Sequence, residues 1–130
     1  MYEVRHFKLD EFRCPCCGEV AAACELVFLL DVSRAYIGVP FRVSSGFRCV
    51  PHNREVGGAE NSRHMIGCAA DLPCPERLTM ARFIEILAPQ FRRPGYEFKP
   101  YLTRNFIHVA VPRQIDELEF WDGGLIRICS

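Results

Sequence analysis

Two histidines and one aspartate constrain this chain more than any other feature of its sequence. His64 and Asp71 lie in the segment SRHMIGCAAD, and His108 lies in the segment FIHV. Two imidazoles and one carboxylate form a common catalytic zinc site, which leaves the fourth coordination position open for water. Such an ion lowers the pKa of the water toward ~7, so that the water becomes a nucleophile at neutral pH. The pattern therefore indicates a metal hydrolase, provided that the fold brings the two segments together.

The spacing of His64 and Asp71 argues against a helix between them. Residues seven apart on a helix share a face but lie roughly 10 Å apart along the axis, too far to share one ion. Gly67 and the three small residues after it instead predict a tight turn that runs into a strand. Such a turn can fold His64 back over Asp71.

Residues 106–111 predict the strand that carries His108. The alternation of a strand puts His108 on one face and three aliphatic side chains on the other. Because the aliphatic face belongs in a core, His108 is expected to point out of the sheet toward a site. Each residue alone also has a structural interpretation: His108 as a hydrogen-bonded strand residue, Asp71 as a turn cap and His64 as a surface loop residue.

The wider pattern predicts an α+β fold, with helices packed on a small, largely antiparallel sheet. Helices are expected at residues 20–37 and 76–87. Gly38 and Pro40 are expected to end the first helix, and Pro89 lies beyond the end of the second. The expected strands are 41–44, 69–72, 106–111 and an added edge strand at 125–129, and the expected loops are 50–68 and 92–104, the second framing the cleft.

Residues 43–71 read VSSGFRCVPHNREVGGAENSRHMIGCAAD. This resembles the zinc D-alanyl-D-alanine carboxypeptidases and the related L-alanyl-D-glutamate endopeptidases of bacteria and phages. That family shares a Ser-Gly-aromatic-Arg turn, a Ser-x-His-x-x-Gly-x-Ala-x-Asp motif and a late strand with aromatic-aliphatic-His-Val, and all three occur here in order. Residues 7–14 also look like the start of its phage-type members. The resemblance covers about residues 6–112 and implies a hedgehog-like architecture in a single domain of residues 1–130, with the tail 113–130 unassigned.

The resemblance also assigns roles to particular residues. It implies that His64, Asp71 and His108 bind one catalytic zinc ion. It makes Arg48 the residue that binds the substrate carboxylate or the oxyanion, and a guanidinium presents the fork of donors suited to either. Ser62 is expected to steady the loop or to touch the substrate backbone. The implied reaction is hydrolysis of a D-Ala-D-Ala or L-Ala-D-Glu bond in the peptidoglycan stem peptide.

The general base is the main departure from the family pattern. Several relatives carry Glu or His three residues before the last zinc ligand, where this chain has Asn105, and many phage-type relatives have Asp in place of Ala110. A base normally contributes ~10²–10⁴-fold. Either another acid reaches the water, with Glu97 on the loop before the last strand preferred over Glu60 and Asp116, or the chain is a weak or inactive zinc-binding module that recognises cell-wall peptide.

Cysteine is the second unusual feature of the composition. A disulfide framework is typical of small secreted chains, and no signal peptide is visible here. The segment CPCCG at residues 14–18 resembles a metal knuckle, and Cys49 and His52 have the gap of a second one. Three interpretations stay open: a structural zinc site of Cys14, Cys17, Cys49 and His52, a disulfide between residues 14–17 and Cys49, or free buried thiols. Because only one true CxxC pair exists, a single catalytic zinc ion is favoured. The eight cysteines are Cys14, Cys16, Cys17, Cys24, Cys49, Cys68, Cys74 and Cys129, of which Cys24 and Cys68 look like small apolar core residues.

Charge and hydropathy restrict the partners. Sixteen basic side chains balance sixteen acidic ones, so no electrostatic footprint for nucleic acid or an anionic membrane is expected. The first twelve residues lack a signal pattern, and no apolar run approaches the ~18 residues of a membrane span. We therefore expect a monomeric, endolysin-like protein made in the cytoplasm, which reaches peptidoglycan through a holin pore, a phage particle or lysis.

Overall fold

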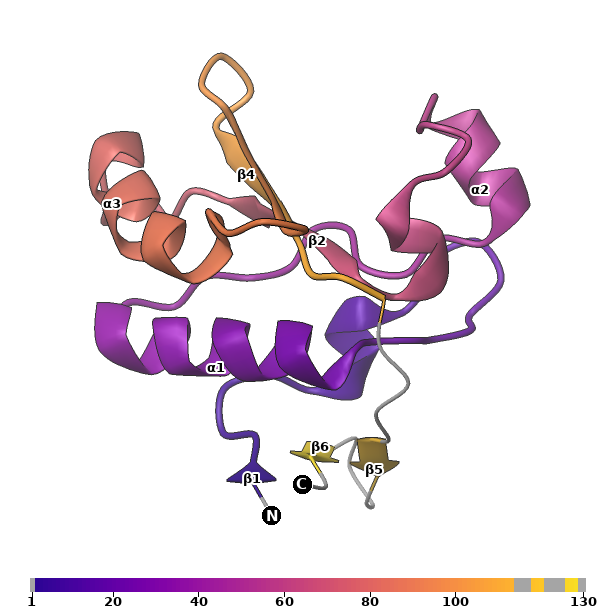
Figure 1. Cartoon of the computed structure of the whole chain (residues 1–130), viewed down its shortest axis with the longest axis horizontal. Helices are drawn as coiled ribbons and strands as arrows, with labels where there is room; N and C mark the ends of the chain where they lie inside the picture. The colour runs from indigo at the N-terminus through magenta and orange to yellow at the C-terminus, as the bar shows by residue number, and fades with distance from the viewer. Residues whose placement is uncertain (1, 114–117, 121–125, 129–130) are drawn as a thin grey trace.

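The computed structural model describes residues 2–113, 118–120 and 126–128 (Figure 1). Their strands form two three-stranded antiparallel sheets, with strand orders β2-β4-β3 and β1-β6-β5. The predicted α+β class is therefore confirmed. In chain order the elements are β1 (Tyr2–Glu3), the 3-10 helix η1 (Leu9–Phe12), α1 (Cys24–Ile37), α2 (Val50–Glu55), the 3-10 helix η2 (Arg63–Ile66), β2 (Ala69–Pro73), α3 (Met80–Phe91), β3 (Glu97–Tyr101), β4 (Phe106–Ala110), β5 (Leu118–Phe120) and β6 (Ile126–Ile128).

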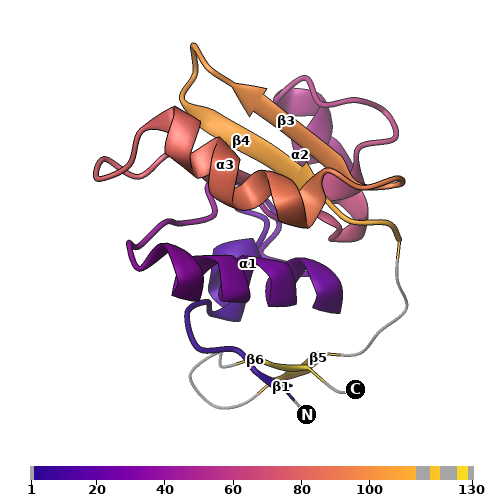
Figure 2. The ribbon, with the colours of Figure 1, turned by 60° about the vertical axis from the view of Figure 1, so that its left-hand side comes forward.

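Helix α1 lies between the two sheets in both views of the ribbon (Figures 1 and 2). Helices α2 and α3 lie on opposite sides of the β2-β4-β3 sheet, and α3 packs against β3, β4 and α1. One face of this sheet is therefore covered by α3 and α1. The other face is left for η2, α2 and the polar side chains of β2 and β4.

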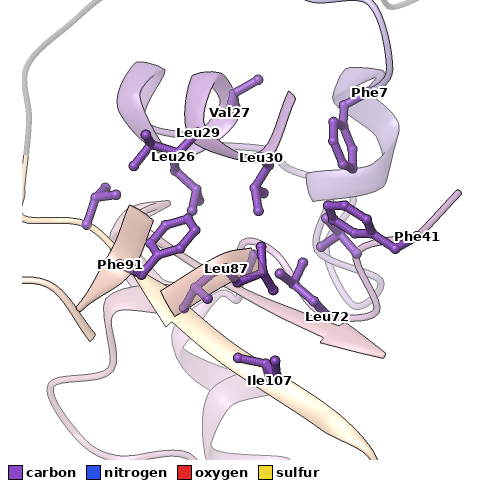
Figure 3. Close-up of a cluster of buried hydrophobic side chains, with 14 of the residues drawn as sticks. Phe7, Leu26, Val27, Leu29, Leu30, Phe41, Leu72, Leu87, Phe91 and Ile107 are labelled. Carbon is purple, nitrogen blue, oxygen red and sulfur yellow. The ribbon is translucent and has the colours of Figure 1, made fainter. Parts of the chain in front are cut away.

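The hydrophobic core fills the space between α1, α3 and the covered face of the sheet (Figure 3). Burying a Leu or Phe side chain completely stabilises the fold by about 1.5–3 kcal/mol. The aliphatic face predicted for residues 106–111 is confirmed, because all three of its side chains are completely buried. The fully buried core residues include Leu26, Val27 and Leu30 from α1, Phe83, Leu87 and Phe91 from α3, and Leu72, Ile107, Val109 and Val111 from the sheet region.

Helix α1 ends as predicted but starts four residues later. Gly38 adopts a left-handed conformation (φ 73°) and caps the helix, a conformation that costs glycine little. The preceding residues are held outside the helix by other partners: Val20 forms a β-bridge with Arg13, and the Ala23 amide donates to the Gly67 carbonyl. These tertiary contacts overrule the helical pattern over residues 20–23.

Helix α3 is displaced toward the C-terminus from its predicted range of 76–87. It begins after Thr79, whose hydroxyl accepts a hydrogen bond from the Arg82 amide, as expected of an N-cap. Pro89 lies inside the helix rather than beyond its end. The last turn persists because it carries the completely buried Phe91 into the core.

Both predicted loops contain regular structure. Residues 50–68 include α2, which has Pro51 in its first turn, and η2; proline is well suited to the first turn because its missing amide has no helical partner there. Residues 92–104 include β3, which pairs with β4 in a hairpin. Pro100 obscures β3 in the sequence, yet β3 is an edge strand, where proline is tolerated. Both loop predictions are wrong in these parts.

Two strand predictions also need correction. Residues 41–44 form no regular strand, because pairing with β2 is limited to an isolated bridge between Ser45 and Asp71. Beyond that bridge the backbone at Gly46 packs against the backbone of Phe12. A Cβ added at position 46 would lie 2.7 Å from the Phe12 Cα. In the tail, β6 is the middle strand of its sheet rather than an edge, and Leu125 and Cys129 lie outside the described residues.

Within the part of the chain that the structure describes, no helix combines the length and the apolar character needed to cross a bilayer.

Candidate metal centre

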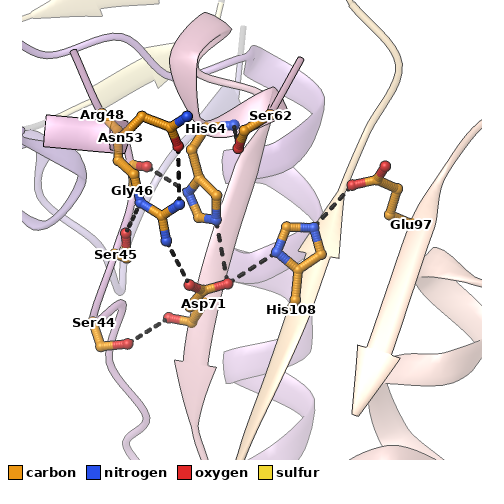
Figure 4. A network of polar contacts seen from close by, with 10 residues as sticks. All are labelled: Ser44, Ser45, Gly46, Arg48, Asn53, Ser62, His64, Asp71, Glu97 and His108. Carbon is orange, nitrogen blue, oxygen red and sulfur yellow. Dashed lines mark hydrogen bonds and ion pairs between the residues drawn. The ribbon is translucent and has the colours of Figure 1, made fainter. Parts of the chain in front are cut away.

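The structure brings His64, Asp71 and His108 together (Figure 4). The register of the sheet places Asp71 of β2 directly opposite His108 of β4, so both side chains project from the same face. Asp71 Oδ1 lies 2.9 Å from His108 Nδ1 and 3.3 Å from His64 Nε2. We call these three residues the His/Asp cluster.

The turn between His64 and Asp71 forms as the sequence predicts. His64 lies in η2, and the next turn is made by Gly67 in the left-handed conformation (φ 73°). A side chain at Gly67 would also collide with the backbone of Ala21, at 2.7 Å from its carbonyl carbon. Ser62 begins the turn, and its hydroxyl accepts a hydrogen bond from the His64 amide at 3.2 Å. Ser62 thus has the loop-steadying contact that was one of its two predicted roles.

Hydrogen bonds fix which nitrogen of each imidazole faces the aspartate. The His64 Nδ1 lies 2.7 Å from the Gly46 carbonyl oxygen, which can only accept, so Nδ1 carries the proton. The His108 Nε2 lies 2.9 Å from Glu97 Oε1, and donation to that carboxylate leaves His108 Nδ1 with its lone pair. In the neutral rings the remaining lone pairs, on His64 Nε2 and His108 Nδ1, face Asp71, whereas a protonated ring donates a hydrogen bond to it. This is the arrangement of histidine metal ligands held by partners on their far side.

Two lone pairs and a carboxylate oxygen repel one another unless a proton or a cation lies between them. Burial raises the pKa of Asp71, but its hydrogen bonds with His108 and His64 outweigh burial and hold that pKa well below its usual range. Burial lowers the pKa of His108, whereas its contacts with Asp71 and Glu97 raise it more. The separations of 2.9 and 3.3 Å fit the ~3.3 Å edge of a tetrahedron with ligand atoms ~2.0–2.1 Å from a zinc ion. The donor set and its dimensions therefore suit a divalent metal.

Arg48 lines the centre on the side opposite His108. Its NH2 lies 3.3 Å from Asp71 Oδ2, its Nε donates to the Ser45 hydroxyl at 3.1 Å, and its NH1 donates to Asn53 Oδ1 at 3.3 Å. The buried Asn53 donates in turn to the carbonyl of residue 59 at 2.8 Å. The guanidinium therefore braces the outer oxygen of Asp71.

Neither Asn53 nor Gly58 was predicted to contribute to the site. A Cβ at Gly58 would lie 2.1 Å from Asn53 Oδ1 and 3.0 Å from Arg48 NH1, so this position requires glycine for the contact between those two side chains. The adjacent Gly57-Gly58 pair is the one sequence signal that marks this close approach.

Glu97 lies on β3, not on an irregular loop as predicted. One carboxylate oxygen contacts His108, and the other lies 3.8 Å from Arg63 Nε. Burial raises the pKa of Glu97, but His108 and Arg63 lower it below its ordinary value. This acid is therefore ionised and engaged by two partners.

The His/Asp cluster forms part of the wall of a pocket of about 520 Å³. Of the described residues that line it, Asp71 and Glu97 are the acids. Neither Glu60 nor Asn105 is among them, and Asp116 lies outside the described residues. The pocket is cationic overall, because its lining includes Arg48, Arg63, Lys99 and Arg104.

A second group of ligand-type side chains consists of Cys14, Cys17 and Cys49. His52, expected in the same group, lies instead with Cys16 and Glu55. None of the seven described cysteines forms a disulfide, and Cys129 lies outside the described residues. Cys24 and Cys68 are buried within the fold, as expected of small core residues.

The chain is similar to known peptidases in two respects. A family model described as Peptidase M15 matches residues 5–110. The zinc D-Ala-D-Ala carboxypeptidase of Streptomyces albus G is 46% identical over 65 residues, which cover 44% of this chain and 25% of that protein. The chain thus spans about a quarter of the length of this curated relative. The family model covers most of the chain, and it agrees with the resemblance that the sequence motifs indicate. The chain therefore belongs to the Peptidase M15 family.

Proposed function

We propose that this protein is a zinc-dependent peptidase that hydrolyses a peptide bond in the peptidoglycan stem, with zinc held by His64, Asp71 and His108. The observation that carries the proposal is the convergence of two imidazole nitrogens and one carboxylate oxygen within 4.8 Å of one another at a pocket. The similarity to a zinc D-Ala-D-Ala carboxypeptidase supports both the metal and the class of substrate.

When bound, a zinc ion in such a site polarises a carbonyl oxygen and lowers the pKa of a coordinated water toward ~7. The chain itself supplies geometry. The Gly46 carbonyl and Glu97 hold the two imidazoles so that an unprotonated nitrogen of each faces Asp71. Arg48 holds the outer oxygen of that aspartate, which leaves Oδ1 for the metal. The three ligands are therefore oriented by hydrogen bonds made on their far sides.

The charge of the pocket fits a substrate that carries carboxylates. Lys99 is paired with His108 in the register of β3 and β4, and Arg104 follows in the turn of the same hairpin. Arg48 uses three of its five N–H donors within the protein, so two remain for a substrate carboxylate or an oxyanion. We therefore retain Arg48 as a substrate-binding residue.

We propose that Glu97 positions His108 rather than acting as the general base. An efficient base has a pKa near the working pH, whereas contacts with His108 and Arg63 lower the pKa of Glu97. Asn105, at the position where several relatives carry the general base, has no basic side chain and lies in the turn before β4 with φ 58°.

The lack of a free carboxylate among the described pocket residues favours a second candidate function. In this alternative the protein binds zinc and recognises cell-wall peptide without cleaving it at a useful rate. Under either function, we propose a hedgehog-like architecture, a single domain and a monomer.

The test is hydrolysis by the zinc-loaded protein of purified peptidoglycan and of two synthetic stem peptides, one ending in D-Ala-D-Ala and one containing L-Ala-D-Glu. Mass spectrometry identifies the cleaved bond and separates carboxypeptidase from endopeptidase activity. A peptidase loses this activity in the His64→Ala variant. If the wild type cleaves nothing but binds the peptides in calorimetry, the binding module is correct; if it does neither, both functions are wrong.

A further inference from the structure

Three thiols from two distant segments meet outside the pocket of the candidate metal centre. Cys14 and Cys17 belong to the N-terminal region, and Cys49 immediately precedes α2. The Sγ atoms of Cys14 and Cys49 are 3.7 Å apart, and all three sulfurs lie within 4.8 Å of one another. We call these residues the thiol cluster.

The backbone of residues 14–18 forms a tight turn that presents two of these thiols on one side. The Gly18 amide donates to the Cys14 carbonyl at 2.9 Å, and the Cys14 amide donates to the Glu19 carbonyl at 2.8 Å. Gly18 has a φ of 77°, a left-handed conformation that favours glycine. This turn fixes the spacing of Cys14 and Cys17 before any ligand is considered.

Backbone amides point at two of the three sulfurs. The Cys49 amide donates to the Cys14 sulfur at 3.5 Å, and the Glu19 amide donates to the Cys17 sulfur at 3.4 Å. Burial raises the pKa of Cys14, but hydrogen bonds from the amides of Cys49, Cys17 and Cys16 lower it to about 6. The neighbouring thiols instead raise the pKa of Cys17 and that of Cys49, so Cys14 is the thiol that ionises first. Thiolates rather than thiols are the form that binds metals.

The spacing of the Cys14 and Cys49 sulfurs is compatible with a shared metal ion and is longer than a disulfide bond. A disulfide joins two sulfurs at about 2.05 Å, and neither Cys14 nor Cys49 is so bonded. Ligand sulfurs about 2.3 Å from a tetrahedral zinc ion are separated by roughly 3.8 Å. The 3.7 Å between Cys14 and Cys49 matches the second value.

We propose that Cys14, Cys17 and Cys49 bind a second zinc ion, which has a structural role. A structural zinc site is closed by a fourth ligand, and the exposed Cys16 offers one, because its thiol already interacts with that of Cys49. The ion cross-links the N-terminal region to the segment that carries Arg48 and α2. Because it uses different ligands, this site does not depend on the proposed peptidase activity.

The test is a count of metal ions in the 130-residue chain, purified under reducing conditions, saturated with zinc and freed of loosely bound metal. Elemental analysis should give two zinc ions per chain for the wild type and one for Cys17→Ser. The matched control is Cys74→Ser, which removes a half-buried thiol outside the thiol cluster and should retain two. With cobalt in place of zinc, the His64→Ala variant should keep one ion and its thiolate-to-cobalt charge-transfer band.

The cobalt spectrum of the wild type tests the proposal even if the Cys17→Ser variant fails to fold. The proposal is wrong if the wild type lacks the charge-transfer band, if Cys17→Ser keeps two zinc ions, or if thiol titration shows Cys14 joined to Cys49. If the wild type binds one zinc ion that Cys17→Ser loses and His64→Ala keeps, the thiol site stands and the proposed peptidase centre fails.

Discussion

The His/Asp cluster and the thiol cluster are built in opposite ways. The side chains of the first project from paired strands and from a helical turn next to a packed core, and sheet register alone sets Asp71 opposite His108. The thiols of the second come from a turn and from the residue before a short helix. In the first cluster the fold sets the geometry of the donor atoms, whereas in the second we expect a bound metal to stabilise the fold.

The two clusters also differ in the chemical type of their donor atoms. Nitrogen and oxygen donors that open on a pocket suit a catalytic ion with an exchangeable position, whereas thiolates suit a closed structural ion. The comparison therefore separates two effects of metal loss. Loss from the His/Asp cluster should abolish turnover and leave the fold, and loss from the thiol cluster should weaken the fold.

The largest expected effect is that of Asp71→Asn on activity. The amide carries no charge, so the metal loses its anionic ligand and Arg48 loses its ion-pair partner. Lewis-acid polarisation is worth several kcal/mol, so we expect kcat/KM for stem-peptide cleavage to fall by about 10³-fold or more. The control is Asp10→Asn, which removes an exposed carboxylate paired with Arg13. Near-normal activity of Asp71→Asn with a full zinc content would contradict the site.

Stepwise removal of zinc should separate the two clusters. A weak chelator should strip the His/Asp cluster first, because three thiolates bind zinc more tightly than two imidazoles and a carboxylate. Activity should then fall to background with little change in the midpoint of thermal unfolding. A strong chelator should also remove the second ion. Even a loss of ~2 kcal/mol would lower that midpoint by roughly 6 °C or more.

Calorimetry and activity are measured on the same samples at each chelator concentration. In the Cys17→Ser variant the strong chelator should produce no further thermal shift beyond that of the weak one. Loss of stability and activity at one common chelator concentration would mean that the two clusters do not differ as proposed.

The His/Asp cluster could be predicted from sequence because local sequence patterns indicate the position and direction of its side chains. The alternation of residues 106–111 defined the buried face and hence the direction of His108, and Gly67 marked the turn that returns His64 to Asp71. Short-range geometry and a specific motif sufficed. The zinc assignment itself stays a prediction.

The surroundings of the cluster could not be predicted, because they depend on contacts between distant segments. Glu97 appeared to lie in a loop since Pro100 breaks the pattern of β3, and only pairing with β4 brings Glu97 beside His108. Asn53 reaches Arg48 only because Gly58 lacks a side chain. The start of α1 likewise depends on bonds that residues 20–23 make elsewhere.

A paired substitution at Glu97 should show whether it positions His108 or removes a proton. Glu97→Ala deletes the acceptor for His108 Nε2, and loss of such a partner typically costs 10–100-fold in metal affinity or activity. Glu97→Gln retains an acceptor oxygen and should bind zinc and cleave nearly as the wild type does. A general base would behave differently: both variants would lose ~10²–10⁴-fold in kcat with unchanged zinc affinity. Zinc titration and kcat are measured together, with the exposed Glu60→Gln as the control.

The smallest effect concerns the support of Arg48, and the glycine pair offers a matched test. Ala at Gly58 would place its Cβ 2.1 Å from Asn53 Oδ1, so the Asn53 amide must move and Arg48 loses one hydrogen bond. A hydrogen bond to a charged group contributes about 1.5–3 kcal/mol, so a tenfold or greater fall in kcat/KM is expected. Gly57→Ala strains a left-handed backbone by about 1 kcal/mol but meets no neighbour within 4 Å. It should therefore lower the free energy of unfolding slightly and keep its activity and zinc content. Equal losses of activity in the two variants would show that the loop, and not the contact between Asn53 and Arg48, supports the metal centre.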